Sequence, residues 1–236
     1  MILKDVFNFN AISKDLISLK RTTKIMISIM LIATIVSFVF GNTYTPIDWL
    51  TLFTSIFMVI SLGLVDEGKI TNYVFGFLSC SGWLLIAIHN KLFGDVASQM
   101  FYILMQFVGI YFWNKNLESE DTVKSRSISL TKGMAFFIMT IIIYLIVLFT
   151  SKNLNGAQVY VDSMLLPLGI VGQFLMTGGY ASQWICWLTI DALNVYIWFN
   201  QLTNSYSSST LTFFILQVIM LINAIYGAIQ WYRNKE

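Results

Sequence analysis

The chain has few charged residues, few cysteines and a single histidine. Only 11% of its 236 residues are charged, whereas soluble domains carry about 25%. Hydrophobic residues make up 57% instead, and the mean hydropathy is +0.72. The apolar runs are about 18–22 residues long, whereas the strands of a membrane barrel would be about 10 residues long and alternating. The composition therefore excludes an ordinary soluble domain and predicts an all-α integral membrane protein, surrounded by the lipid bilayer.

The scarcity of cysteine and histidine removes the usual ingredients of metal and catalytic sites. Cys80 and Cys186 both fall inside apolar runs, where packing is more usual than a disulfide. His89 stands alone near the end of a run, so we interpret it as an interfacial residue rather than a ligand. The sequence contains no Gly-rich phosphate loop and no nucleophile–base pair. We therefore expect no metal, no cofactor, no nucleic-acid partner and no enzymatic activity.

The apolar runs predict about eight transmembrane helices. They cover approximately residues 24–41, 46–65, 70–90, 97–114, 129–150, 158–177, 180–200 and 209–232. Residues 1–22 have apolar positions at helical spacing among several Lys and Arg, which fits either an interfacial amphipathic helix or a solvated tail. We predict no cleavable signal peptide, because this N-terminal stretch stays polar and mixed up to the first run.

Lys and Arg fall almost entirely on one side of these spans. With the N-terminus in the cytoplasm, the outer loops hold only Lys91 and Lys152. The inner segments then hold Lys4, Lys14, Lys20, Arg21, Lys24, Lys69, Lys115, Lys124, Arg126, Lys132, Arg233 and Lys235. Basic residues concentrate on the cytoplasmic side of membrane proteins. We therefore expect a multi-pass protein of the bacterial plasma (inner) membrane with both termini in the cytoplasm.

The two halves of the chain resemble each other. The stretch Gly68–Tyr73 (GKITNY) aligns with Gly179–Trp184 (GYASQW), and Gly109–Trp113 (GIYFW) aligns with Gly227–Trp231 (GAIQW). This pattern predicts two parallel three-helix repeats, with a substrate site between them near the middle of the membrane. The single membrane domain, 1–236, then divides into a tail with an extra N-terminal helix (1–45), a first repeat (46–115), a cytoplasmic loop with a linking helix (116–157) and a second repeat (158–236).

Four residues of the seventh run form a polar and aromatic face. Trp184, Trp187, Asp191 and Asn194 are spaced i, i+3, i+7 and i+10, which places them on one side of a helix. Asp191 is the only acid near the middle of any span, where an isolated carboxylate costs about 2.5–3.5 kcal/mol. It must therefore face a cavity or a partner. The two tryptophans suggest a site for a flat molecule that could carry positive charge.

The same motif resembles the PnuC-type vitamin transporters. The resemblance rests on Gln183-Trp184-x-x-Trp187 followed by Asp191, and on the stretches Gly172–Tyr180, Gly68–Gly76 and Met105–Trp113. It covers about residues 45–235. It implies a fold like that of the SWEET sugar transporters, nicotinamide riboside as the leading substrate, and facilitated diffusion followed by phosphorylation inside the cell. It also implies homotrimers. Thiamine, a deoxynucleoside and riboflavin are the alternative substrates.

Nicotinamide riboside combines a cationic pyridinium ring, a carboxamide and ribose hydroxyls. Trp184 and Trp187 could stack on the ring, a contact worth about 0.5–2 kcal/mol per face, and Asp191 could offset its charge or accept ribose hydroxyls. The remaining candidates are amides for the carboxamide and sugar, and aromatic residues that could close or gate the pocket: Asn194, Asn72, Gln106, Gln173, Tyr73, Tyr111 and Trp113. The alternatives are interfacial anchoring for the tryptophans and helix–helix hydrogen bonds for the polar residues.

Three other functions remain open on the sequence alone. Ion-coupled transport is one, because Asp191 could carry a proton. An intramembrane enzyme would need a nucleophile–base pair or metal ligands that the chain lacks. A scaffold or receptor for a partner protein would show no stabilisation by a small-molecule substrate.

Overall fold

A computed structural model describes residues 6–89, 93–115, 125–153 and 159–233. Over these ranges the chain is helical, which confirms the predicted all-α class. The helices are α2 (Phe9–Ser18), α3 (Arg21–Phe40), α4 (Pro46–Asp66), α5 (Asn72–His89), α6 (Phe93–Lys115), α7 (Leu130–Asn153), α8 (Val159–Thr177), α9 (Gln183–Asn204) and α10 (Ser208–Arg233). Each of the eight predicted spans corresponds to one of the helices from α3 to α10.

Seven of these helices are long and apolar enough to cross a membrane: α3, α4, α5, α6, α7, α8 and α10. The exception is α9, although it has 22 residues. We expected residues 180–200 to be apolar enough to cross a bilayer, but Gln183, Asp191 and Asn194, together with the amides near its C-terminal end, lower its hydropathy. All three are buried, and α9 packs between α8 and α10. Its polar face is therefore directed at protein rather than at lipid.

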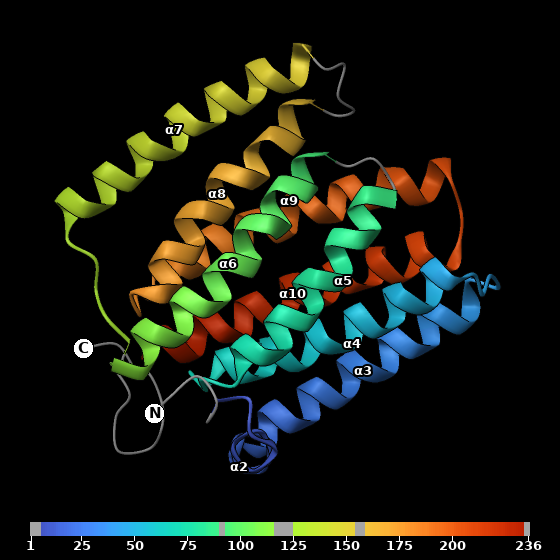
Figure 1. Cartoon of the computed structure of the whole chain (residues 1–236), viewed down its shortest axis with the longest axis horizontal. Coiled ribbons are helices and arrows are strands. Elements are labelled where there is room, and N and C mark those ends of the chain that lie inside the picture. Colours follow the sequence, from blue (N-terminus) through green and yellow to red (C-terminus); the bar gives the residue numbers. More distant parts are fainter. Residues whose placement is uncertain (1–5, 90–92, 116–124, 154–158, 234–236) are drawn as a thin grey trace.

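The long helices form two groups of three, and α2, α3 and α7 lie outside these groups. In sequence order, α4, α5 and α6 pack on one another, as do α8, α9 and α10. Contacts of α4 with α10 and of α6 with α8 join the groups, and α3 packs against both α4 and α10. The linking helix α7 lies at the edge of the molecule against α8 (Figure 1), and none of its residues is buried.

The turns that open the middle helix of each group have the same backbone structure. Gly68 and Gly179 have φ angles of 66° and 72°, a left-handed conformation that glycine adopts without steric cost. The amides that follow them close matching hydrogen bonds, Lys69 N to Leu64 O at 2.9 Å and Tyr180 N to Leu175 O at 2.9 Å. The equivalence of these turns supports the internal repeat inferred from the sequence.

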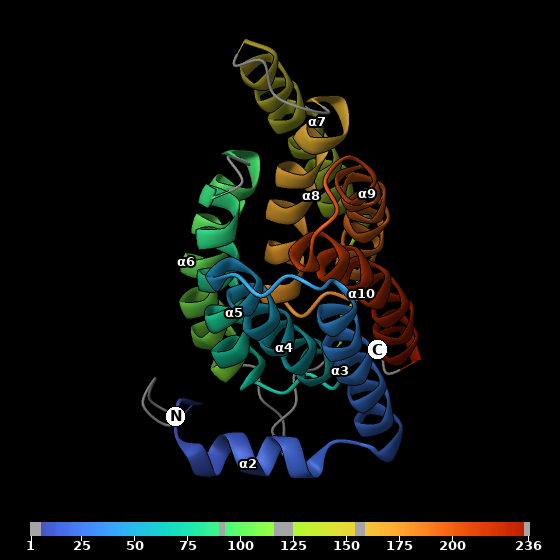
Figure 2. The same cartoon turned by 90° about the vertical axis from the view of Figure 1, so that its right-hand side faces the viewer.

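Helix α2 lies across one end of the bundle, roughly perpendicular to the long helices (Figure 2). Its inward side is anchored by Asp15, which is buried and accepts a hydrogen bond of 2.7 Å from the Thr71 hydroxyl. Phe9 and Ile17 are 78% and 73% exposed, as expected of an amphipathic helix at a membrane interface. Of the two interpretations of residues 1–22, the structure therefore favours the interfacial helix over the solvated tail.

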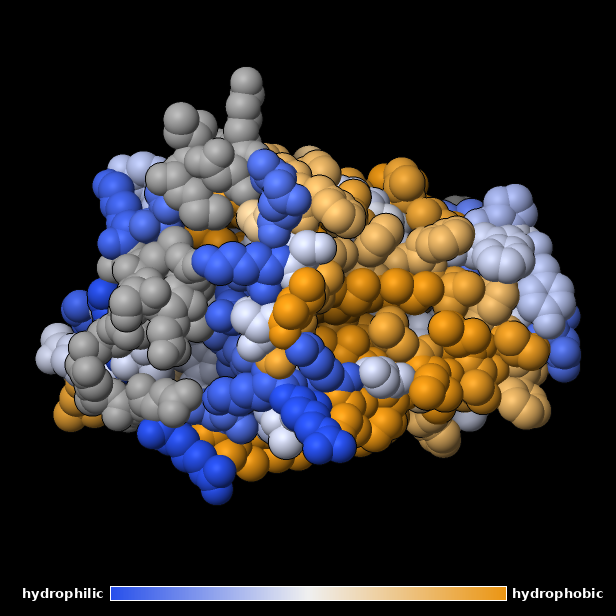
Figure 3. Space-filling model, turned by 90° about the horizontal axis from the view of Figure 1, so that it is seen from below, coloured by the Kyte–Doolittle hydropathy of each residue, from blue (hydrophilic) through white to orange (hydrophobic). Residues whose placement is uncertain are grey.

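On the face seen in Figure 3, a broad hydrophobic region lies between a strongly hydrophilic end and a smaller group of hydrophilic residues at the opposite end. On α3 the hydrophobic region includes Ile25, Ile29, Ile32 and Val36, all strongly exposed. Large apolar side chains exposed to water would promote aggregation, whereas the hydrocarbon core of a membrane is a suitable environment for them. The distribution of surface polarity is therefore that of a membrane protein.

Candidate substrate site

A cavity opens between the two three-helix groups. It is lined by α4, α5 and α6 on one side and by α8, α9 and α10 on the other. Seven of the ten residues predicted for the site line it: Asn72, Gln106, Gln173, Trp184, Trp187, Asp191 and Asn194. The structure therefore brings together, at the interface of the repeats, residues that are far apart in the sequence.

The predicted face of α9 forms one wall of the cavity. Trp184, Asp191 and Asn194 are 3%, 4% and 8% exposed, and the Asp191 carboxylate makes no hydrogen bond with any described residue. The Trp187 indole N–H donates to Gln183 Oε1 at 3.3 Å, and its ring lies against Gly172 of α8. Asp191 is thus held in the cavity without a protein partner, as a ligand-facing acid would be.

The opposite wall includes a polar stripe on α6. Asp95, Ser98, Gln99, Tyr102 and Gln106 all line the cavity, at spacings that keep them on one helical face. The Gln106 side chain donates from Nε2 to the Tyr102 carbonyl at 2.9 Å. Of these residues only Gln106 was identified from the sequence. The stripe was missed because its members are mostly uncharged and the run also reads as an ordinary apolar span.

Tyr102 is one of the residues that connect the two walls. Its ring centroid lies 6.3 Å from that of Trp187, at an interplanar angle of 57°. Its hydroxyl group reaches α8 at Gly169, in the space that a Cβ atom there would occupy. Tyr102 therefore spans the interface between the repeats beside Trp187.

Five buried polar atoms of the lining residues have no hydrogen-bond partner among the described residues: Trp83 Nε1, Gln99 Oε1, Gln173 Nε2, Gln183 Nε2 and Trp184 Nε1. A buried donor or acceptor left unpaired costs about 1–3 kcal/mol. Four of the five are N–H donors and one is an amide oxygen. The cavity therefore suits a ligand that carries several acceptors as well as donors.

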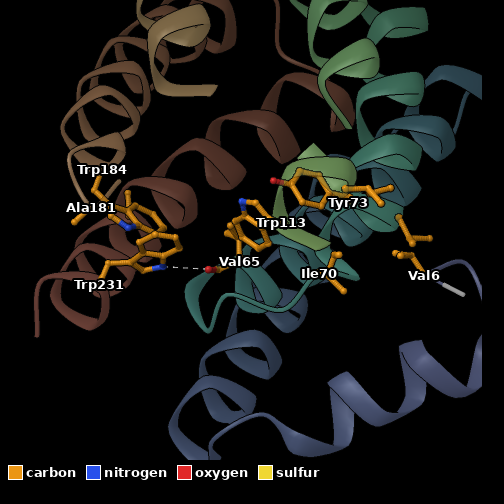
Figure 4. Close-up of a cluster of buried hydrophobic side chains, with 11 residues drawn as sticks. Val6, Val65, Ile70, Tyr73, Trp113, Ala181, Trp184 and Trp231 are labelled. Carbon is orange, nitrogen blue, oxygen red and sulfur yellow. Dashed lines mark hydrogen bonds between the residues drawn. The ribbon is translucent and has the colours of Figure 1, made fainter. Parts of the chain in front are cut away.

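Three predicted site residues lie outside the cavity lining. Tyr73 and Trp113 are fully buried with ring centroids 5.0 Å apart, in an aromatic cluster at the end of the bundle near α2 (Figure 4). Tyr111 is 56% exposed, and the Lys115 ammonium donates to its hydroxyl. The prediction that Tyr111 closes the pocket is thus not supported by its position, because it lies on the outward face of α6.

Within the described residues, no group of three His, Cys, Asp or Glu side chains is arranged to hold a metal ion. Cys80 and Cys186 are both buried free thiols, and Cys80 lines the cavity. The chemistry available in the site is that of aromatic faces, amides, hydroxyls and carboxylates. These groups bind and orient a small molecule.

Comparison with known proteins assigns the family. A family model described as nicotinamide mononucleotide transporter matches residues 48–233. The chain belongs to this family. It is 23% identical over 201 residues to the nicotinamide riboside transporter PnuC of Haemophilus influenzae, covering 84% of this chain and 85% of the relative. It is 25% identical over 194 residues to the transporter of the same name from Neisseria mucosa, covering 80% and 73%.

The structural comparison agrees with the family assignment. A crystal structure of the vitamin B3 transporter PnuC matches with a TM-score of 0.78 and 25% identity, covering 91% of this chain and 92% of that one. The resemblance seen in the sequence and the predicted fold are thereby confirmed. Membership of a transporter family identifies the chain as a multi-pass membrane transporter, with the cavity between its helix groups as the candidate path for substrate.

Proposed function

We propose that this transporter takes up nicotinamide riboside across a bacterial inner membrane by facilitated diffusion. The observation that carries this proposal is the combination of Trp184, Trp187 and Asp191 on one wall of the cavity. An aromatic face and a carboxylate suit the flat, positively charged pyridinium ring. The relatives named above as nicotinamide riboside transporters support the same substrate.

The charge of the cavity favours the riboside over its 5′-phosphate, the mononucleotide that gives the family its description. Among the described lining residues the charged side chains are Asp95 and Asp191, and none is Lys, Arg or His. A phosphate group would bring its negative charge near two carboxylates and find no basic partner. The riboside carries a net positive charge instead. Phosphorylation inside the cell would therefore trap the substrate, since the product no longer suits the cavity.

The unpaired polar atoms fit the rest of the molecule. The carboxamide oxygen and ribose oxygens can accept from Gln173 Nε2, Gln183 Nε2 and Trp184 Nε1. Gln99 Oε1 and the Asp191 carboxylate can accept from the carboxamide N–H or ribose O–H groups. Asn72, Gln106 and Asn194 supply further amides. The predicted site is thus extended by Gln183, Gln99 and Tyr102.

Transport would follow from movement of one repeat against the other. We take residues 46–115 and 158–236 as the two moving units, the segment 116–157 as the connection that carries α7, and 1–45 as an accessory tail and helix. Both termini would lie in the cytoplasm on the basic side. Because α7 is apolar and unburied, it is free to contact lipid or other copies in a homotrimer.

Binding to the purified protein tests the proposal. Calorimetry is run with nicotinamide riboside, its 5′-phosphate, thiamine, riboflavin and a deoxynucleoside, using wild type and Asp191→Asn. We expect selective riboside binding that the substitution weakens about tenfold, the equivalent of 1.4 kcal/mol. Thr189→Val is the matched control, because Thr189 is exposed on the same helix and bonds only its own helix backbone.

The other outcomes separate the alternatives. Binding of thiamine alone would retain a cationic substrate and reject the riboside. Binding of only riboflavin or a deoxynucleoside would reject the charge argument for Asp191. Transport that follows an imposed proton or sodium gradient in proteoliposomes would replace facilitated diffusion by ion coupling.

A further inference from the structure

The cavity contains a second acid that the central site does not use. Asp95 lies in the first turn of α6 and lines the cavity together with Gln99, one turn further along the same helix, and Trp83 of α5. These three residues provide a carboxylate, an amide and an indole. They repeat the combination of side chains that Asp191, Asn194 and Trp187 provide at the centre.

Gln99 indicates that this group faces a ligand rather than only packing. Its side chain is 5% exposed, and its Oε1 atom has no hydrogen-bond partner among the described residues. An amide oxygen buried in this way loses its hydration without compensation. Gln99 lines the cavity four residues after Asp95, so the two side chains lie on the same face of α6.

Tyr102 connects this group to the central site. It follows Gln99 on the cavity face of α6 and contacts the Trp187 ring. It also lies within electrostatic range of both Asp95 and Asp191. Trp113 at the end of α6 and Trp184 at the start of α9 share one cluster, so these helices run in opposite directions. Asp95 and Asp191 therefore both line the cavity on the side of Tyr102 toward the start of α6, with Asp95 further from Tyr102 along its helix than Asp191 is from Trp187. A cation that crosses low-dielectric surroundings needs compensation along its whole path, not only at the midpoint.

We propose that Asp95, Gln99 and Trp83 form an outer subsite that holds the cationic ring of the substrate before it reaches Trp187 and Asp191. This inference rests on the proposed function. Asp95 is near the start of α6, at the opposite end of that helix from Trp113 and the aromatic cluster, so the subsite lies toward the outer side in the proposed orientation. It makes Asp95 a determinant of selectivity for charged substrates.

Two structural roles compete with this assignment. An acid in the first turn of a helix is stabilised by the helix dipole, and Trp83 packs on Phe213 with ring centroids 5.0 Å apart. Asp162, in the first turn of α8, is also close enough to interact electrostatically with Asp95. Unlike Asp95, however, Asp162 is not among the lining residues. Comparing variants of the two acids therefore separates the effect of a local subsite from that of a general negative potential.

Paired substrates test the subsite. Uptake into proteoliposomes is measured for nicotinamide riboside, which is a cation, and for its 1,4-dihydro form, which has nearly the same shape and no charge. We expect Asp95→Asn to raise the apparent KM for the cation about tenfold, as loss of one favourable charged contact would, and to change the KM for the neutral form less than about twofold. Asp95→Glu keeps the charge and should retain most of the cation selectivity.

Asp162→Asn is the matched control, and it should change neither KM by more than about twofold. If Asp95→Asn raises the apparent KM equally for both substrates, the role of Asp95 is structural only. Equal effects of Asp95→Asn and Asp162→Asn on the cation would indicate a diffuse field without a subsite. Wild-type protein that moves neither compound would refute the proposed function itself. Wild-type uptake that Asp95→Asn leaves unchanged refutes only the subsite.

Discussion

Trp113 and Trp231 form a crossed pair at one end of the substrate path. Their ring centroids lie 6.3 Å apart. Trp113, at the end of α6, donates its indole N–H to the Met176 carbonyl of α8 at 3.0 Å. Trp231, at the end of α10, donates to the Val65 carbonyl of α4 at 3.2 Å, as Figure 4 shows. Each tryptophan therefore binds the backbone of the repeat to which it does not belong.

The crossed pair lies at the end where α2 crosses the bundle, in the cluster that also buries Val6 and Ile70. Because both hydrogen bonds join the two repeats, separation of the repeats at this end breaks both of them. Buried aromatic contacts and hydrogen bonds of this kind stabilise one of the two relative positions that packed repeats can adopt. We therefore expect the pair to hold the two repeats together on the side of the membrane that α2 occupies.

Removing the two indole N–H groups should make the cavity easier to open from that side. Each Trp→Phe change deletes one hydrogen bond, worth about 0.5–1.5 kcal/mol. Native Cys80 lines the cavity and provides the probe, in a Cys186→Ser background. We expect Trp113→Phe with Trp231→Phe to accelerate modification of Cys80 by a membrane-impermeant maleimide added on the α2 side by about fivefold or more.

Trp49→Phe is the control for that experiment, because Trp49 is 47% exposed near the start of α4. It should leave the labelling rate unchanged, and excess riboside should slow labelling in every variant. An unchanged rate in the double variant would mean that other contacts keep this end closed.

The spans and their order were predictable because hydropathy depends on composition rather than on the partner of each helix. The Gly68 and Gly179 turns were predictable as well, since local backbone conformation restricts residue choice there. The same information indicated that Asp191 must face a cavity. Hydropathy could not predict how deeply each aromatic residue is buried or which residues it contacts, because both depend on how the two repeats pack against each other.

Tyr111 and Trp113 illustrate that limit. Tyr111 follows Gln106 by five residues, which is about 140° around a helix from the cavity face, so its outward position follows from spacing. Trp113 lies close to the cavity face, yet it packs against the other repeat beyond the end of the cavity. Spacing identified the face of α6, but only the arrangement of the repeats determined where the cavity ends.

The equivalent turns should respond equally to substitution. Gly68→Ala and Gly179→Ala each force a side chain into a left-handed conformation, at a cost of about 1–2 kcal/mol. We expect both variants to lower the thermal unfolding midpoint in detergent by similar amounts. A Gly133→Ala variant is the reference, because Gly133 on α7 has open space around it. A large loss at only one of the two turns would contradict their equivalence.

Tyr102 should be displaced by a single methyl group on the facing helix. In Gly169→Ala the new Cβ would occupy the place of the Tyr102 hydroxyl, so the ring must leave its present position, in which it contacts Trp187. We expect riboside affinity to fall about fivefold or more, since offset aromatic contacts contribute about 0.5–1.5 kcal/mol. The fall should be greater than in Tyr102→Phe, which keeps the ring in place. Calorimetry on Gly169→Ala and Tyr102→Phe, with Gly133→Ala as reference, measures this difference.

The unpaired amide of Gln173 should lower the stability of the ligand-free protein and raise its affinity for the riboside. Its Nε2 atom is buried without a partner, so Gln173→Met removes a desolvation cost of about 1–3 kcal/mol while preserving side-chain length. We expect a higher unfolding midpoint in the ligand-free protein and a riboside affinity reduced about tenfold.

Gln217 provides the matched control. Both of its side-chain polar atoms are unpaired and it is fully buried, but it does not line the cavity. Gln217→Met should therefore raise the midpoint and leave binding unchanged. If Gln173→Met and Gln217→Met stabilise the protein alike and neither affects binding, the unpaired amide of Gln173 is a packing defect. If only Gln173→Met weakens binding, its amide is held unpaired for the substrate.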